Sequence, residues 1–111
     1  MLTQAKEREL QNFAREIRIQ TIRQIGIRGF GHIGGCMSIA DLLSVLYGED
    51  MKYDPQNPAW EERDWLVCSK GHAGPAIYAA LALKGFFPME WMETLNQPGT
   101  NLPSHCDRRK T

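Results

Sequence analysis

The sequence lacks the features that bring a chain to a membrane or to nucleic acid. No apolar run approaches the about 20 residues that a helix needs to cross a bilayer. The first eight residues carry too many charges for a signal peptide. Neither sign of charge dominates, because 13 basic side chains balance 13 acidic ones. We therefore expect one globular unit in the cytoplasm that binds neither membranes nor nucleic acid.

Paired cysteines are lacking as well. The three cysteines, Cys36, Cys68 and Cys106, are far apart and form no Cys-x-x-Cys motif, which argues against a disulfide framework and a zinc knuckle. We expect reduced thiols. His32 and His105, with Cys36 and Cys106, carry metal-binding atoms, but their spacing specifies no point where ligands converge. The sequence therefore predicts no metal ligands in this chain.

Residues 2–28 have the spacing of a long amphipathic helix. Its stripe recurs at three- and four-residue steps, at Leu10, Phe13, Ala14, Ile17, Thr21 and Ile25. Ile19, Ile22 and Ile27 widen this apolar face. Two interpretations fit the wider face: the second half of the helix packs on two neighbours, one of them another chain, or the whole helix is a core element of this domain.

Glycine is concentrated in the next segment, with five glycines in residues 26–35. Each glycine inside a helix costs about 1 kcal/mol relative to alanine, so we expect a loop over residues 26–36. His32 stands in this loop, where a glycine backbone lets a ligand approach closely. Two possibilities remain open: His32 contacts a bound ligand, or it faces solvent on a flexible linker.

A second helix is predicted from a capping-box pattern. Ser38 and Asp41 have the spacing of that motif, an apolar stretch follows, and Gly48 ends the helix. The proline- and acid-rich residues 49–64 predict a surface loop, for which Trp60 is the expected anchor.

The segment that follows predicts a strand feeding a helix. Residues 66–69 are a short apolar run, and an alanine-rich helix with Pro75 in its first turn extends to Lys84. A helix start offers free N–H groups and a positive dipole end to an anion, and Lys70 and His72 lie beside it in sequence. An ordinary strand-to-helix turn is the alternative.

The remaining residues add a short helix and a tail to the predicted elements, but no second strand. Gly85 ends the helix, Pro88 opens a short one, and residues 99–111 form an irregular tail. A single strand has no partner for its backbone groups, so the rest of the sheet must come from a longer polypeptide or a partner chain. The fold class expected is α/β, helix-rich, with an incomplete parallel sheet.

Three histidine motifs resemble the start of transketolases in their order and spacing. They are Gly31-His32-Ile33-Gly34-Gly35, Ser69-Lys70-Gly71-His72-Ala73 and Leu102-Pro103-Ser104-His105-Cys106-Asp107. Arg63-Asp64 before the strand matches too, and residues 76–85 look most like the N-terminal subunit of split bacterial transketolases. The resemblance extends from about Leu10 to Asp107.

The resemblance implies that residues 1–111 are part of a thiamine-diphosphate-binding α/β domain, with the cofactor held between two domains of a dimer. His72 would lie beside the diphosphate, and His32 and His105 would line the sugar channel and bind substrate. All three would help move protons while a two-carbon ketol unit passes from a ketose phosphate to an aldose phosphate. The cofactor-binding residues implied are Ser69, Lys70, Gly71 and His72.

The chain also departs from the family. It has no Gly-Asp-Gly motif with a downstream Asn, so the ligands of the family's Mg²⁺ must lie elsewhere. Ser104 and Cys106 replace the usual Gly and Pro around His105, which loosens the turn that would fix this side chain. We expect the chain alone to be inactive and to need a C-terminal transketolase subunit or the remainder of the enzyme.

Two alternatives to a transketolase remain. In the first, the chain is a non-catalytic remnant or interaction module that docks on a transketolase-like partner through its N-terminal helix and strand edge. In the second, it belongs to another thiamine-diphosphate enzyme, such as dihydroxyacetone synthase or deoxyxylulose-phosphate synthase. Residues 69–73 look closer to transketolase than to the latter.

Overall fold

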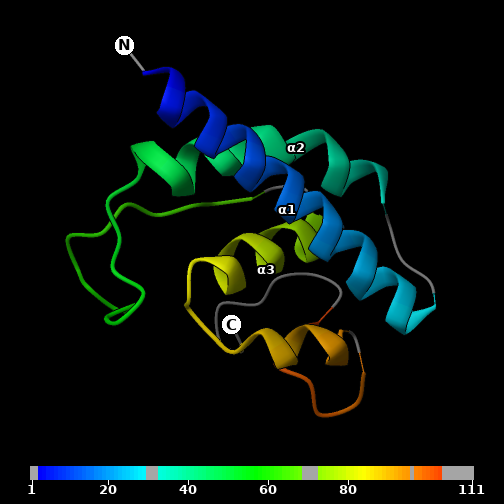
Figure 1. Ribbon diagram of the computed structural model, residues 1–111. Coiled ribbons are helices and arrows are strands. Elements are labelled where there is room, and N and C mark those ends of the chain that lie inside the picture. Colours follow the sequence, from blue (N-terminus) through cyan, green and yellow to red (C-terminus); the bar gives the residue numbers. More distant parts are fainter. Residues whose placement is uncertain (1–2, 30–32, 69–72, 96, 104–111) are drawn as a thin grey trace.

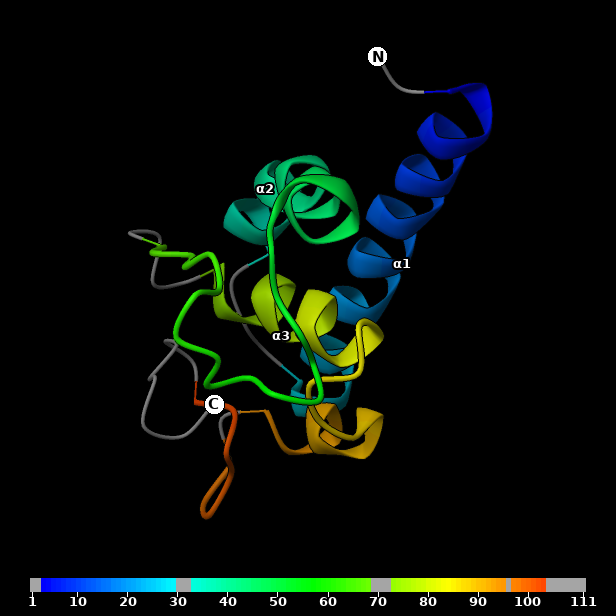
Figure 2. The ribbon, with the colours of Figure 1, turned by 90° about the vertical axis from the view of Figure 1, so that its left-hand side faces the viewer.

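The computed structural model describes residues 3–29, 33–68, 73–95 and 97–103. These residues form the helices α1 (Gln4–Arg28), α2 (Gly34–Val45) and α3 (Gly74–Leu83), the π-helical turn η1 (Leu46–Asp50) and the 3₁₀ helix η3 (Met89–Thr94). Helix α1 crosses the whole molecule, and α2 and α3 lie on one side of it (Figures 1 and 2). Helix α3 packs against both α1 and α2. None of the described helices is long and apolar enough to span a membrane.

Helix α1 confirms the amphipathic helix expected near residues 2–28, and both of its ends are capped. At the start, the Thr3 hydroxyl accepts a hydrogen bond from the Lys6 N–H at 3.1 Å. At the end, Gly29 adopts a left-handed conformation with φ of 93° and donates its N–H to the Ile25 carbonyl. The next described residue is Ile33, the N-cap of α2.

The core lies where α3 meets α1 and α2. Every residue of α3 from Gly74 to Ala80 is buried, and four alanines in its sequence let the neighbouring helices approach closely. From α1 the core receives Leu10, Ala14, Ile17, Thr21, Gln24 and Ile25, and from α2 it receives Cys36, Ala40, Leu43 and Ser44. Helix α3 is therefore the central element of the fold, although it is the shortest of the described α-helices.

The glycine-rich loop predicted over residues 26–36 is much shorter than expected. Helix α1 continues through Gly26, and α2 begins at Gly34, which leaves only residues 29–33 between the helices. The prediction was wrong because burial of Ile25 at the end of α1 and of Cys36 at the start of α2 outweighs the cost of glycine in the helix ends. The capping box was also wrong, since Ser38 lies inside α2 and donates its hydroxyl to the Gly35 carbonyl.

Gly48 does not end the second helix, contrary to the prediction. It lies within η1, where the chain makes a close approach to α1. A Cβ atom at this position would stand 2.5 Å from Leu10 Cδ2 and 3.4 Å from Phe13 Cδ2. A side chain at this position would therefore have to displace Leu10, so Gly48 marks a close approach to α1 and not the end of a helix.

Residues 65–68 form no strand, so the predicted sheet is absent from the described residues. The alternation of a strand is nevertheless present: Trp65 and Val67 are exposed, with 62% and 84% of their surface accessible, while Leu66 and Cys68 are half-buried. A ladder needs a second strand, and the described part of the chain supplies none. The described fold is accordingly helical, with one segment patterned for a sheet.

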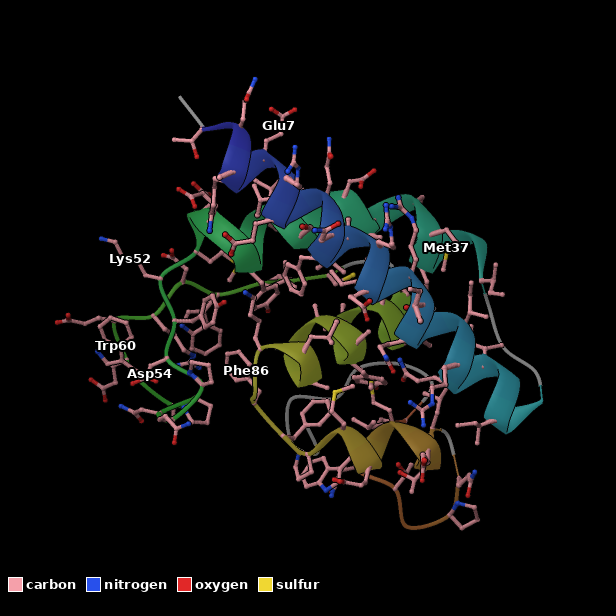
Figure 3. All side chains as sticks on the ribbon, in the orientation of Figure 1. Glu7, Met37, Lys52, Asp54, Trp60 and Phe86 are labelled. Atoms are coloured by element: carbon pink, nitrogen blue, oxygen red, sulfur yellow. The ribbon has the colours of Figure 1, made fainter. Side chains whose placement is uncertain are left out.

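Tyr53 joins the long loop after η1 to the helices. Its ring lies 5.4 Å from the rings of Tyr47 and Phe86, and its hydroxyl donates to the Tyr47 carbonyl. Trp60, the expected anchor, lies at the outer end of the loop, away from the helices (Figure 3). The loop is thus anchored at its beginning rather than at its middle.

The widened apolar face of α1 is not buried within this chain. Ile19, Ile22 and Ile27 expose 46%, 53% and 47% of their surface, so the residues of this chain do not cover them. Both interpretations, burial in the core of the domain and contact with a further chain, stay predictions.

We expect alanine to be poorly tolerated at Gly48 and well tolerated at Gly26. Gly26 lies in the exposed part of α1, where an added methyl group would meet nothing within 4 Å, so Gly26→Ala should raise the free energy of unfolding by about 0.5–1 kcal/mol. Gly48→Ala should be less stable than Gly26→Ala by about 1–3 kcal/mol, because the new methyl group displaces Leu10. Urea denaturation of both variants measures the difference, and equal stabilities would contradict the close approach.

An ion pair on the surface joins α1 to α2. Arg18 donates from Nη1 and Nη2 to the two carboxylate oxygens of Asp41, at 3.2 and 3.1 Å. These hydrogen bonds lower the pKa of Asp41 below its usual value. Because 78% of the Asp41 side chain is exposed, solvent screens most of this attraction.

We expect Asp41→Asn to destabilise the chain slightly at neutral pH and less in acid. The loss should be at most about 0.2–1 kcal/mol, as for other exposed pairs. A carboxylate with a lowered folded-state pKa stabilises above its unfolded value of about 3.9, and this contribution disappears as the pH falls through the folded value. Denaturation curves at pH 7 and at decreasing pH below about 3.9 test this, and a difference that did not shrink as the pH falls would point to another cause.

Candidate functional site

The residues predicted to act on cofactor or substrate lie outside the described residues. They are His32, Ser69, Lys70, Gly71, His72 and His105. Their predicted roles therefore stay predictions. The structure does describe residues that flank these segments: Gly29 and Ile33, Cys68 and Ala73, and Pro103.

The two helices that follow the first two histidine motifs begin without a side-chain cap. Ile33 precedes α2 and Ala73 precedes α3, and neither side chain carries an acceptor. Helix α1 differs, because the Thr3 hydroxyl caps it. The first-turn N–H groups of α2 and α3 thus donate no hydrogen bond to an N-cap side chain. At the start of α3 such groups fit an anion, as the sequence predicts.

Gln24 connects α1 to the first turn of α3. Its side-chain Nε2 donates to the Pro75 carbonyl at 2.8 Å, and only 1% of the residue is exposed. Pro75 is the second residue of α3. Gln24 was not predicted from the sequence, because a polar residue within an amphipathic helix is ordinarily exposed; its neighbour in the apolar stripe, Ile25, was the only available signal.

Tyr78 connects α3 to the segment before the third histidine. Its side chain is fully buried and its hydroxyl donates to the Pro103 carbonyl. Leu102, also fully buried, donates its N–H to the Thr100 hydroxyl at 2.9 Å. Residues 102–103 therefore lie against the core, so the start of the expected irregular tail is held in place. A tyrosine within an alanine-rich buried helix was the signal for such a contact.

A groove of about 730 Å³ lies beside α3. Residues 65–68 line one wall, and Ile77, Tyr78 and Leu81 of α3 line another. Most of the lining side chains are apolar; Arg63 and Asp64 are the charged ones. The half-buried side of the strand-like segment thus faces the core helix, with open space between the loop and α3.

The described residues match one part of the expected cofactor better than the other. The start of α3 suits a diphosphate, because its first-turn N–H groups are hydrogen-bond donors that no N-cap side chain uses. For Mg²⁺, the described ranges contain no group of three or more His, Cys, Asp or Glu side chains that could hold a metal ion together. The diphosphate part of the cofactor fits the described residues, and the metal has no ligand set among them.

Comparison with known proteins defines the class. Residues 9–111 match the family model described as "Transketolase, thiamine diphosphate binding domain". The chain therefore belongs to the transketolase family, as its three histidine motifs predict.

Two relatives and one solved structure illustrate the similarity. The chain is 60% identical over 103 residues to the 6-deoxy-6-sulfo-D-fructose transketolase subunit SqwG of Clostridium sp. (strain MSTE9), covering 93% of this chain and 38% of that protein. It is 34% identical over 102 residues to transketolase 1 of Escherichia coli (strain K12), covering 91% and 15%. The structure of transketolase from Leishmania mexicana superimposes with a TM-score of 0.87 at 33% identity, covering 92% and 15%. The chain thus spans well under half the length of each.

We expect Tyr78→Phe to loosen residues 102–103. Loss of the hydroxyl removes a hydrogen bond to Pro103 and should lower the free energy of unfolding by about 0.5–1.5 kcal/mol. The Leu102 amide should then exchange its hydrogen faster. Tyr53→Phe is the matched control, because it removes a similar hydroxyl-to-carbonyl hydrogen bond at Tyr47. Equal exchange at Leu102 in both variants would show that Tyr78 does not hold this segment.

Proposed function

We propose that this chain is the N-terminal part of a transketolase that uses thiamine diphosphate to transfer a two-carbon ketol unit from a ketose phosphate to an aldose phosphate. The observation that carries the proposal is the match of residues 9–111 to the family's thiamine-diphosphate-binding domain. The first turn of α3, which has no side-chain cap and directly follows the Ser69–Ala73 motif, supports it independently. Such an enzyme works in carbohydrate metabolism, in the pentose phosphate pathway, and in the cytoplasm.

The start of α3 has a defined task in this proposal. Its first-turn N–H groups and positive dipole end bind the diphosphate, and Ser69, Lys70, Gly71 and His72 line the same anion site. The bound cofactor supplies the carbanion chemistry. Lys70 contributes positive charge, and His72 donates a hydrogen bond or a proton near the diphosphate.

His32 and His105 bind the substrate in this proposal. An imidazole has an unperturbed pKa of about 6.5, so one ring both donates and accepts protons near neutral pH. These two residues hold sugar hydroxyls and move protons to and from them. The contact between Tyr78 and Pro103 supports the role of His105, because it fixes the backbone two residues before this histidine.

The proposed enzyme requires further polypeptide. The same matched stretch is 38% of the SqwG subunit but 15% of the Escherichia coli enzyme, which supports a transketolase divided between two subunits. A C-terminal subunit, or the remainder of one longer chain, would supply the Mg²⁺ ligands and the second half of a dimeric cofactor site. The groove beside residues 65–68 would receive the rest of the sheet.

A sulfonated sugar is a second candidate substrate. The relative with 60% identity is named for 6-deoxy-6-sulfo-D-fructose, whereas the identity to Escherichia coli transketolase 1 is 34%. A sulfonate and a phosphate are both tetrahedral anions at the end of the sugar, so the ketol chemistry at the other end is common to both. The pocket that binds the anionic group of the substrate would therefore select between a phosphate and a sulfonate.

We expect the enzyme assembled from this chain and its complementary part to transfer a ketol unit only with thiamine diphosphate and Mg²⁺. In that enzyme, Lys70→Ala should weaken thiamine diphosphate binding by about tenfold, because it removes a charge from the anion site. Isothermal titration measures the affinity. A coupled assay with a ketose phosphate and with 6-deoxy-6-sulfo-D-fructose as alternative donors identifies the substrate.

Lys84→Ala is the matched control, since Lys84 stands at the opposite end of the same helix. It should leave the affinity for the cofactor unchanged. An assembled enzyme that binds no thiamine diphosphate would refute the proposal. Unchanged activity of a transketolase-like partner on adding this chain would favour the interaction module.

A further inference from the structure

Gln24 has a buried side-chain amide whose nitrogen forms a hydrogen bond and whose oxygen has no partner among the described residues. It lies between α1 and α3 with 1% of its surface exposed, and its Nε2 donates to the Pro75 carbonyl at 2.8 Å. Its Oε1 atom is also buried and has no hydrogen-bond partner among the described residues. Gln20, one turn earlier in α1, likewise has a buried Oε1 for which the described part of the chain offers no donor.

Stability alone does not account for an amide at position 24. A buried carbonyl oxygen without a donor loses its hydrogen bonds to water and gains nothing in return. An apolar side chain of similar length would fill the same space without a buried oxygen that lacks a donor, which would offset part of the loss of the hydrogen bond to Pro75. What glutamine provides and an apolar residue does not is the N–H donor directed at Pro75.

That donor acts on a sensitive part of α3. The helix begins Gly74-Pro75, and its N-cap Ala73 offers no side-chain hydrogen bond. Glycine leaves the backbone free to adopt several conformations, and proline has no N–H with which to tie the turn to a neighbour. The hydrogen bond from Gln24 in α1 therefore orients the first turn of α3, which no N-cap side chain holds in place.

We propose that Gln24 is a positioning residue for the cofactor site. It holds the first turn of α3 in register with α1, so that the N–H groups at this helix start converge on the diphosphate. This role rests on the proposed function, because it presumes that the start of α3 binds thiamine diphosphate. Gln24 touches neither cofactor nor substrate and acts only through Pro75.

The test compares Gln24→Met with Gln20→Met in the complete enzyme. Methionine matches the length of glutamine and lacks the donor, and Gln20 is an amide on the same helix that serves as control. We expect the Kd for thiamine diphosphate, measured by titration at fixed Mg²⁺, to rise about tenfold in Gln24→Met. The KM for the ketose at saturating cofactor should not rise. The melting temperature of the cofactor-free enzyme should not fall. Gln20→Met should resemble the parent enzyme in all three measurements.

The outcomes separate this inference from the function on which it rests. If the parent enzyme binds no thiamine diphosphate, the proposed function fails and the inference with it. If the parent binds the cofactor and Gln24→Met binds it equally well, only the positioning role is refuted. Failure of Gln24→Met to fold, or an equal loss of affinity in Gln20→Met, would show a general structural role and would also overturn the inference.

Discussion

The close packing of α3 between α1 and α2 is the constraint on which the rest of the structure depends. Ala76, Ala79 and Ala80 are fully buried, so neighbouring helices approach the α3 backbone without intervening large side chains. Larger residues fill the remaining space around these alanines, and two of them, Ile17 and Tyr78, have no exposed surface. Such an interface tolerates little added volume, and it fixes the start of α3 together with the ends of the helices beside it.

The sequence predicted those elements whose signals are local. The stripe of α1, Pro75 in the first turn of α3 and Gly85 after its end all appear in the structure, the last with φ of 88°. Each of these signals concerns backbone geometry or a periodic face, which one helix determines by itself. The extents of such helices were therefore predictable from sequence.

Tertiary contacts decided the features that the sequence did not predict. Gly26 and Gly34 lie within helices because packing outweighs intrinsic preference, and Gly48 is explained only by the position of Leu10. At the candidate site, the helix start at α3 was visible in the sequence, whereas the contact of Gln24 with Pro75 joins residues 51 positions apart. No local pattern encodes a pair so distant in the chain.

The groove beside residues 65–68 has a consequence for the order of folding. The helical core is closed by contacts among α1, α2 and α3, and none of these contacts uses a strand. The helices can therefore assemble first, since their contacts require less chain to be ordered than a parallel sheet does. The segment at Trp65 and Val67 then remains as an open template, with its backbone still hydrated, until other strands add to it. Folding of the cofactor domain would thus proceed outward from a preformed helical layer.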